Sequence, residues 1–376
     1  MITVREVSAS DLDSLSDFLS AQPPFSHTTK DTWMRRFHTW WVSNPVNNAR
    51  YPMGWVLVDK EKILGFLGNI PLKFLMYGKE KIAAAAVAWY VDPTVRGIYS
   101  LRLFDEFLQQ PGVSIFLFNS DSEALIRLIS RYGFKKYVLP KFQNNYYLVL
   151  QRRRFLFLLK ELGAIKNIRD ALFLRGSGSL IWKIFRGLVF QDDIQFLRAF
   201  HTEEYSSSLC SSCDESFSKI WESSNDQCDV MMMRTIETLH WIYFSSISPS
   251  ERIVLQCRRI RDDSLVGYMV FDIKRQKPSD TAVMKLMDVC LERFNSGVVT
   301  SLLQCAISTA IQNRIPLLEF WAWDEKSEEF FRDRFSIRKK AQHHNLIRLS
   351  DTVQQQATPP VICTSIIDPP RGIDHF

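Results

Sequence analysis

The sequence lacks the short motifs that identify several large enzyme classes. Its 376 residues contain no Gly-Lys-Ser/Thr phosphate loop, no G-x-S-x-G nucleophile elbow and no H-E-x-x-H zinc motif. Kinase, serine-hydrolase and zinc-protease functions therefore have no motif to support them. No run approaches the roughly 20 apolar residues of a membrane span, and the opening residues lack the basic and apolar regions of a signal peptide. We therefore expect a soluble, cytoplasmic protein.

Cysteine is scarce and unevenly placed. The seven cysteines lie between Cys210 and Cys363, and an odd, scattered set does not form a disulfide framework. Cys210 and Cys213 have CxxC spacing, but no second CxxC and no histidine at ligand spacing accompany them. Two free thiols in a serine-rich loop are therefore favoured over a zinc or redox site, and we predict no bound metal.

Length and charge indicate two domains joined by a basic segment. A chain of 376 residues with 46% hydrophobic residues can build two cores. Residues 152–190 hold nine Lys and Arg but two Asp and Glu, mixed with large apolar residues. Such a segment can contact an anionic membrane or RNA phosphates. The alternative is a pair of interdomain helices with solvated bases.

The central feature of the first half is a strand, a turn and a helix. Residues 82–91 carry no charge, which is typical of a strand buried on both faces, and Asp92-Pro93 ends it. Apolar residues then recur at helical spacing from Ile98 onward. The first turn of a helix binds anions, Gly97 allows close approach and Arg96 can bond a phosphate. An ordinary β–α connection with a solvated arginine stays open as the alternative.

The elements around this feature follow a recognisable order. Patterning predicts a strand, two helices, three antiparallel strands, and then helix, strand, helix and strand. The expected ranges are 2–7, 12–19, 31–42, 54–58, 63–76, 81–91, 98–108, 113–118, 123–132 and 146–150.

This order resembles the GNAT acyltransferase superfamily over most of residues 1–150. The likeness rests on the strand end Trp89-Tyr90-Val91-Asp92-Pro93, the Arg96-Gly97 turn, and the block Phe116-Leu117-Phe118-Asn119 with Gly133-Phe134 after it. The resemblance implies an α+β (α/β) protein with two GNAT-like domains, each a mixed, mostly antiparallel central sheet flanked by helices. It also implies acetyl-CoA or another acyl-CoA as cosubstrate.

The resemblance assigns the residues of a cosubstrate site and shows where this chain departs from the family. Tyr99 and Leu101 stand where the family has small residues, and Ile129 stands at the position of its general-acid tyrosine. Tyr132, one turn further along the helix, is our candidate for that acid; the alternative is a tyrosine packed at a helix end. The residues implied to bind the cosubstrate are Tyr90, Val91, Arg96, Gly97, Ile98, Tyr99, Ser100, Leu101, Asn119 and Ser122.

Two further residues are candidates for substrate contact. Asn69 lies in an unusual Gly-Phe-Leu-Gly-Asn-Ile-Pro segment and could orient a polar group, but Gly68-Asn69 could equally form a strand bulge. Trp89 belongs to the buried strand. No acidic residue lies within 82–91, so the base for an acceptor amine has no obvious position.

The second half repeats the order of the first, which indicates a second GNAT-like domain. Its turn at 292–297 lacks the Arg-Gly pair, although Gly297 could occupy one glycine position of the family. Whether this domain binds a cofactor stays open. The expected organisation is an N-terminal acyl-CoA-binding domain at 1–151, a basic helical linker and loop at 152–229, a C-terminal domain at 230–350 and a tail at 351–376.

Together these features predict an enzyme that moves an acetyl or other acyl group from acyl-CoA to a small-molecule amine. The whole-chain pattern resembles uncharacterised bacterial members linked to surface polysaccharides, which implies an amino sugar as acceptor. A homodimer is compatible with this reading. Two alternatives stay open: a Fem-like transferase that uses aminoacyl-tRNA, supported by the basic segment, and an inactive GNAT-like binding or scaffold protein.

Overall fold

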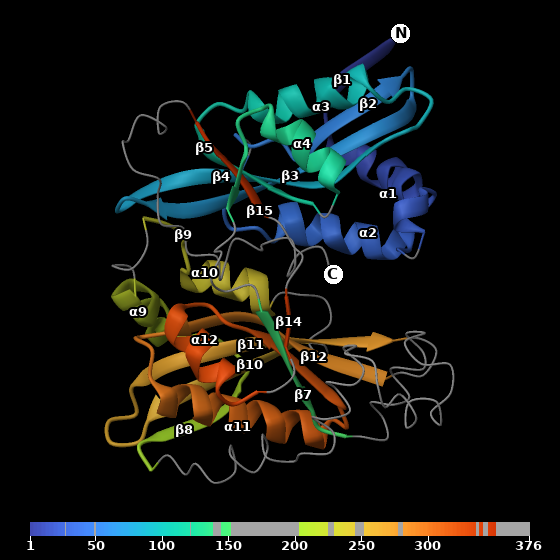
Figure 1. The fold of residues 1–376 in the computed structure, drawn as a ribbon. Helices are drawn as coiled ribbons and strands as arrows, with labels where there is room; N and C mark the ends of the chain where they lie inside the picture. Colours follow the sequence, from blue (N-terminus) through green and yellow to red (C-terminus); the bar gives the residue numbers. More distant parts are fainter. Residues whose placement is uncertain are drawn as a thin grey trace, which may run out of the picture. The chain divides into compact units, whose positions relative to one another are not determined.

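The chain forms two units, each assembled from separate stretches of sequence (Figure 1). The first consists of Met1–Val138, Asp226–Ile247 and His343–Phe376, and the second of Leu139–Asn225 and Ser248–Gln342. The computed structural model describes residues 1–26, 28–48, 50–120, 122–137, 144–151, 203–224, 229–244, 252–276, 281–335, 338–340 and 345–350. The basic segment 152–190 and the tail 351–376 lie outside the described residues.

A mixed sheet forms the centre of the first unit. Its strands pair antiparallel except for one parallel pair, β4 and β5. In spatial order they are β1 (Ile2–Glu6), β2 (Gly54–Asp59), β3 (Lys62–Met76), β4 (Lys79–Val91), β5 (Val113–Asn119), β15 (Asn345–Leu349) and β6 (Lys135–Tyr137), with β9 (Val230–Met232) on β3.

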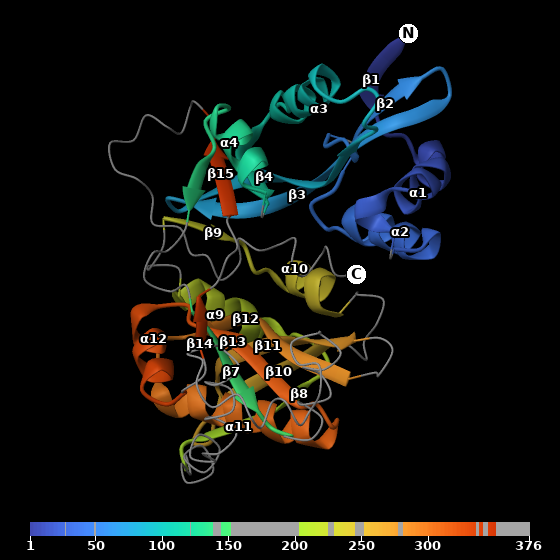
Figure 2. The same cartoon turned by 45° about the vertical axis from the view of Figure 1, so that its right-hand side comes forward.

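Helices cover both faces of this sheet (Figures 1 and 2). One face packs against α1 (Leu12–Ser20) and α2 (Lys30–Phe37), which continues as the π-helix η3 (His38–Val42). The other face packs against α3 (Ile98–Leu108) and α4 (Glu123–Ser130). The remaining short helices of this unit are η1 (Ala9–Asp11), η2 (Pro23–Phe25), α10 (Ile236–Leu239) and the π-helix η5 (His240–Phe244).

The local sequence explains this arrangement. The central strands are apolar runs buried on both faces, as expected for the middle of a covered sheet. Tyr77 and Gly78 have φ of +48° and +70°, which suits the tight turn of the β3–β4 hairpin. Trp33, Trp40 and Trp41 are buried in the core, so core packing explains these three tryptophans.

The second unit repeats this strand order. Its single parallel pair is β12 and β13, the counterparts of β4 and β5. In spatial order the strands are β8 (Tyr205–Cys210), β10 (Arg252–Arg259), β11 (Leu265–Gln276), β12 (Thr281–Leu291), β13 (Leu317–Trp321), β7 (Asn144–Val149) and β14 (Arg338–Lys340), and the described helices are α9 (Glu215–Ser224), α11 (Ser296–Gln312) and α12 (Glu325–Arg332).

The two units exchange one strand. We expected β7 to close the N-terminal sheet, but it pairs with β13, with Leu148 opposite Leu318. Conversely, β15 pairs with β5 of the first unit, with Leu346 opposite Phe118. Figure 2 shows the red strand β15 in the blue-to-green sheet and the green strand β7 in the orange one. β7 alternates buried and half-buried residues, whereas β15 buries Leu346, Ile347 and Leu349. Neither pattern specifies a partner strand, so local sequence alone does not distinguish the two placements.

Other differences concern residues 203–244. The serine-rich region from residue 205 onward, predicted to be part of the linker and loop, contains β8, which forms the edge strand beside β10. The helix near the start of the predicted C-terminal domain begins at Ile236, because β9 precedes it and pairs with β3 of the first unit. This helix belongs to the first unit, where Trp241 Nε1 donates a hydrogen bond of 2.7 Å to the Thr39 carbonyl. Long-range pairing thus overrides the local loop pattern.

Candidate functional site

Strand β4 carries a bulge near its C-terminal end. The pairing of β4 with β3 shifts between Phe66 and Gly68, and Ala88 has φ of +50°. A bulge of this kind redirects the side chains that follow it. Trp89 accordingly packs with the α3/α4 core, whereas Tyr90 meets the rings of α1 and η2 on the opposite face.

Beyond this region the sheet opens between β4 and β5. Their parallel pairing ends at Ala85 and Leu117, whereas β4 continues to Val91. In the described part of the chain, the last residues of β4 have no ladder partner on the β5 side. Unpaired strand edges offer backbone donors and acceptors to an extended ligand. The unpaired edge of β4 can therefore offer backbone hydrogen bonds to an extended ligand.

A tight turn connects β4 to α3. Asp92 Oδ1 accepts hydrogen bonds from the Thr94 backbone N–H at 2.9 Å and from its hydroxyl at 2.6 Å. These bonds to Thr94 hold the pKa of Asp92 below its usual value. Gly97 follows with φ of +90° and ψ of −111°, a conformation that side chains disfavour. The turn thus brings the chain from the end of the strand directly into the helix.

The N-terminus of α3 has no side-chain cap. The Leu101 N–H donates to the Gly97 carbonyl at 3.3 Å, so the helical bonds begin only there. The preceding N–H groups lie in the first turn, where helical geometry provides no partner and the dipole is positive. These groups belong to Ile98, Tyr99 and Ser100.

Arg96 lies beside this helix end. Its Nε donates a 2.8 Å hydrogen bond to the Val91 carbonyl, and its guanidinium lies 5.3 Å from the centroid of the Tyr90 ring. Its terminal nitrogens make no hydrogen bond among the described residues, although its charge interacts with that of Asp92. A guanidinium anchored by Nε still offers donors to an anion. Predicted site residues from β4, the turn and α3 are therefore close together.

The large side chains that depart from the family pattern, Tyr99 and Leu101, do not cap the N–H groups at the start of α3. Ile98 is 62% exposed, and Tyr99, Ser100 and Leu101 are partly buried. The guanidinium of Arg102 lies 5.3 Å from the centroid of the Tyr99 ring. None of these side chains caps the helix. The larger residues therefore leave the backbone of the first turn available.

The residues after β5 have structural partners. Asn119 ends the strand, and Ser122 caps α4 by accepting a 3.4 Å hydrogen bond from the Leu125 N–H. Ile129, at the position of the family's tyrosine, is fully buried in the α3/α4 core. Whether Asn119 and Ser122 bind a cosubstrate stays a prediction.

Tyr132 lies at the end of α4 against α3. Its ring meets Phe104 edge-on, with centroids 5.1 Å apart. Burial raises the pKa of Tyr132, and the nearby carboxylate of Asp105 adds to the rise. The hydroxyl therefore stays protonated at neutral pH, as a proton donor requires. Its catalytic role stays a prediction beside this packing contact.

Asn69 is fully buried and connects three segments. Its Nδ2 donates 2.8 Å hydrogen bonds to the Pro52 carbonyl and to Gln110 Oε1, and its own carbonyl accepts from Trp41 Nε1. Its Oδ1 is buried and has no hydrogen-bond partner among the described residues. The role of Gln110 as its partner had no signal in the sequence.

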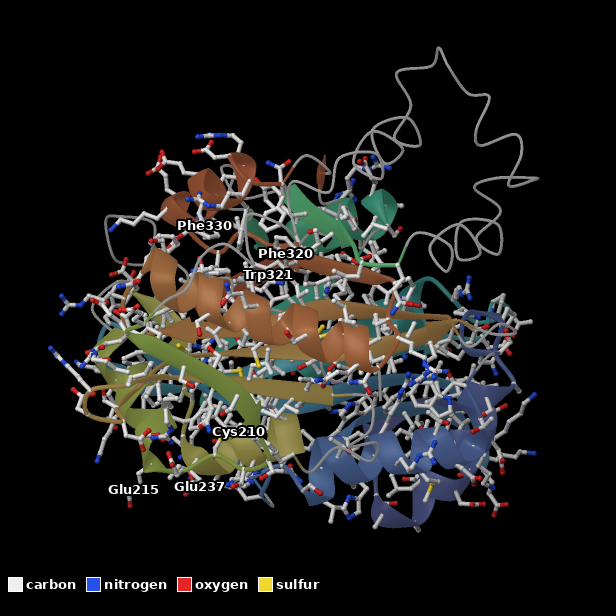
Figure 3. All side chains as sticks on the ribbon, turned by 90° about the horizontal axis from the view of Figure 1, so that it is seen from below. Cys210, Glu215, Glu237, Phe320, Trp321 and Phe330 are labelled. Atoms are coloured by element: carbon white, nitrogen blue, oxygen red, sulfur yellow. The ribbon has the colours of Figure 1, made fainter. Side chains whose placement is uncertain are left out.

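The second unit has the same gap, but a tryptophan bridges it. Pairing of β12 with β13 ends at Lys285 and Glu319, and Trp321 Nε1 donates a 2.9 Å hydrogen bond to the Leu286 carbonyl. Figure 3 shows Trp321 beside Phe320. The second residue after the last pair is Trp321 here and Asn119 in the first unit. No indole occupies that position in the first unit.

At the start of the helix that follows this second gap, a side chain already accepts hydrogen bonds from the backbone N–H groups. Asn295 caps α11, where its Oδ1 accepts hydrogen bonds from the Gly297 N–H at 2.8 Å and the Val298 N–H at 3.3 Å. Its Nδ2 donates to the Tyr205 hydroxyl at 3.0 Å. The N–H groups bonded here are equivalent to those at the start of α3, which has no side-chain cap. No sequence motif predicted the Asn295 cap or the hydrogen bond from Trp321 across the gap.

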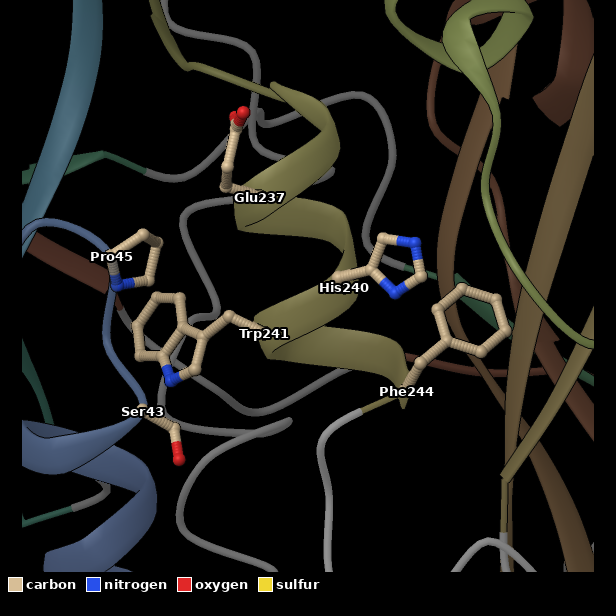
Figure 4. Close-up of a pocket in the computed structure, with 6 residues that line it drawn as sticks. All are labelled: Ser43, Pro45, Glu237, His240, Trp241 and Phe244. Atoms are coloured by element: carbon tan, nitrogen blue, oxygen red, sulfur yellow. The ribbon is translucent and has the colours of Figure 1, made fainter.

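Two pockets among the described residues lie away from the end of β4 and the start of α3. One, of about 410 Å³, belongs to the first unit (Figure 4). Its lining residues are Ser43, Pro45, Glu237, His240, Trp241 and Phe244. Trp241 points toward Ser43 and Pro45, whereas the rings of His240 and Phe244 are neighbours, with centroids 5.4 Å apart.

The other pocket, of about 290 Å³, lies beside the capped start of α11 in the second unit. Arg259 on its wall pairs with Asp262 and with Glu292. Because these carboxylates already neutralise part of its charge, the pocket has no clear preference for an anion. Its lining residues are Tyr205, Arg259, Val266, Glu292, Arg293, Asn295 and Val298.

The structure describes five of the seven cysteines, and all five are free thiols. Burial raises the pKa of both Cys210 and Cys213, so their thiolates are disfavoured. Within the described ranges, no group of His, Cys, Asp and Glu side chains could hold a metal ion. In the same ranges, no helix has the length and apolar character needed to cross a membrane.

No protein-family model and no curated protein matches the sequence. Solved structures, in contrast, match nearly its whole length. A GCN5-related N-acetyltransferase from Anabaena variabilis matches with a TM-score of 0.59 at 11% identity, covering 94% of this chain and 74% of the other.

Two other structures match comparably. N-myristoyltransferase from Saccharomyces cerevisiae with bound myristoyl-CoA has a TM-score of 0.53 at 12% identity, covering 92% of this chain and 78% of the other. A probable N-acyltransferase from Enterococcus faecalis has a TM-score of 0.55 at 9% identity, covering 93% and 73%. This protein, with its two mixed sheets flanked by helices, therefore has a GNAT-like fold.

Proposed function

We propose that this protein is an N-acyltransferase that moves an acetyl or other acyl group from acyl-CoA to a small-molecule amine. One observation carries the proposal: the open gap between β4 and β5 leads to the uncapped start of α3. An extended thioester with a pyrophosphate at one end matches that combination of an unpaired strand edge and an anion site.

The pyrophosphate would bind at the start of α3. The N–H groups of Ile98, Tyr99 and Ser100, which precede the first helical hydrogen bond, would supply donors, and the terminal nitrogens of Arg96 would add charge-assisted bonds. Gly97 allows the phosphate to approach, because the space around its Cα is open. Leu101 would make no contact with the pyrophosphate through its N–H, because that group donates to the Gly97 carbonyl.

The rest of the cosubstrate would lie along the free edge of β4. Backbone groups up to Val91 can bond the pantetheine amides, and Tyr90 and Trp89 flank the thioester on opposite faces. Asn119 and Ser122 would border the β5 side. Asn69, the other residue predicted to contact substrate, is fully buried, so it would act from beneath the site by holding Gln110 and Pro52 in place. This assignment keeps every predicted binding residue in one unit.

The reaction joins the amine nitrogen to the acyl carbon and breaks the carbon–sulfur bond. The amine loses a proton, and the departing sulfur gains one. Tyr132 would donate the proton to sulfur, since its raised pKa keeps it protonated. The base that takes the amine proton is unassigned.

Only the first unit would bind a cosubstrate. Trp321 bridges the gap of the second unit, and Asn295 occupies the N–H groups at the start of α11. We therefore expect one acyl-CoA per chain. An amino sugar acceptor, a homodimer and a cytoplasmic location stay predictions of the sequence.

A binding protein without turnover is the second candidate. It is favoured by the buried Ile129 at the family's acid position and by the engagement of Ser122 as a helix cap. A Fem-like transferase depends on the basic segment, which lies outside the described residues. Retained acetyl-CoA binding without acyl transfer to any amine would favour the binding protein.

Calorimetric titration of acetyl-CoA tests the proposal. We expect micromolar binding that weakens about tenfold in Arg96→Ala, the scale of one charge-assisted contact. Arg127→Ala is the matched control, because Arg127 is an exposed arginine on α4 that pairs only weakly with Glu123. Equal loss in both variants, or no binding by the wild type, would refute this site.

A further inference from the structure

Trp89 lies across the opening between β4 and β5. Its indole stacks on Phe104 of α3, with centroids 5.0 Å apart and planes at 9°. It also meets Phe118 of β5 edge-on at 5.8 Å. One side chain from β4 thus contacts both the helix and the strand that border the gap.

The rings around Trp89 are themselves packed. Phe104 contacts Tyr132 at 5.1 Å and Phe134 at 5.7 Å, and both Phe104 and Phe118 are buried. Interiors packed in this way have little room for added atoms unless a side chain moves. The α3/α4 side of the gap is therefore filled near the thioester position.

The opposite side of the gap is filled as well. Tyr90 is buried and meets Phe18 at 6.0 Å and Phe25 at 6.1 Å, both edge-on. Phe25 also meets Trp33 at 5.2 Å. Because successive strand residues alternate, one large ring lies on each face of the sheet, and the bulge at Ala88 turns Trp89 toward α3 and Tyr90 toward α1.

We propose that Trp89 is the residue that limits the acyl group to a short chain. This inference rests on the proposed acyl-CoA site. An acyl chain in the gap meets the indole as it grows, and further methylenes fit only if the indole leaves its stack on Phe104. Up to that length, each buried methylene raises affinity about fourfold. Beyond it the gain stops or reverses.

Removing the indole of Trp89 should allow longer acyl chains to bind. Trp89→Ala leaves an apolar space lined by Phe104 and Phe118, and such cavities accept apolar ligands. Trp55→Ala is the matched control. Trp55 is a buried tryptophan of the same core that meets Phe107 edge-on at 6.2 Å, but it lies on β2, away from the gap.

The experiment measures the affinity of CoA, acetyl-, butyryl- and octanoyl-CoA by calorimetry for the wild type and both variants. We expect the wild type to bind octanoyl-CoA no more tightly than butyryl-CoA. Trp89→Ala should bind octanoyl-CoA at least tenfold more tightly than the wild type does, whereas Trp55→Ala should keep the wild-type order. If Trp89→Ala does not fold, Trp89→Leu makes the same test with a smaller change of volume.

The outcomes separate this inference from the proposed function. Wild-type affinity that rises steadily to octanoyl-CoA overturns the limit, as does a Trp89 variant with the wild-type order of chain lengths. If none of the four compounds binds, CoA included, the proposed acyl-CoA site is refuted and this inference falls with it. Binding of CoA and acetyl-CoA with an unlimited chain length refutes the role of Trp89 alone.

Discussion

The indole nitrogen of Trp321 donates a hydrogen bond to the carbonyl oxygen of Leu286 at 2.9 Å, across the gap between β12 and β13. Trp321→Ala removes this bond and the packing of the ring, and we expect it to lower the free energy of unfolding by roughly 3 kcal/mol. Acetyl-CoA should still bind once per chain, because Asn295 continues to cap α11. Calorimetry and urea unfolding measure both effects. Two sites per wild-type chain would contradict the assignment.

Gly97 has a backbone conformation that a side chain strains, and open space surrounds its Cα. Gly97→Ala should destabilise the protein by about 1–3 kcal/mol and weaken acetyl-CoA binding, since the methyl group lies where the phosphate would approach. Gly112→Ala is the control, because Gly112 also has positive φ (+78°) and open space but precedes β5. Equal effects of both variants on binding would argue against a phosphate at Gly97.

Tyr132→Phe removes the proposed proton donor and keeps the ring against Phe104. We expect kcat to fall about 100-fold while acetyl-CoA affinity and Tm change little. Steady-state assays with an amine acceptor and a melting curve make the comparison. An unchanged kcat would assign Tyr132 to packing alone.

Tyr147 on β7 makes stability sensitive to alkaline pH. Burial, followed by the charge of Glu319, raises the pKa of Tyr147 to about 12. In the unfolded chain it titrates near 10. The stability that depends on its protonated form is therefore present below about pH 10 and is lost as pH rises toward 12.

Urea unfolding at pH 8 and pH 11 tests this effect. Between these values the wild type should lose more stability than Tyr147→Phe, whose ring cannot ionise. If the wild type and Tyr147→Phe lose the same free energy of unfolding between pH 8 and pH 11, the hydroxyl of Tyr147 is solvated and the prediction is wrong.

The exchanged strand β15 should stabilise the first unit although it comes from the end of the chain. Leu346 is fully buried there. Leu346→Ala should cost about 2–5 kcal/mol. Leu209→Ala on β8 should cost little, because Leu209 is 58% exposed. Thermal unfolding compares the two. A small effect of Leu346→Ala would contradict the placement of β15.

Local patterns predicted much of the fold and part of the site. The uncharged strand, the Asp92 turn and the helix from Ile98 form as expected, because burial on both faces and helical spacing are properties of neighbouring residues. The two GNAT-like sheets flanked by helices were also predicted, and the structural matches confirm the fold class. The roles of the site residues stay predictions.

The sequence by itself determined most of the strands and helices, β8 and β9 excepted, and where the turn between β4 and α3 falls. Only the tertiary structure decided that β7 and β15 exchange sheets, that the bulge at Ala88 turns Trp89 rather than Tyr90 toward α3, and that Trp321 closes the second gap. These features depend on pairings between residues far apart in the chain. No local propensity encodes such pairings, because each strand fits either sheet until its partners are present.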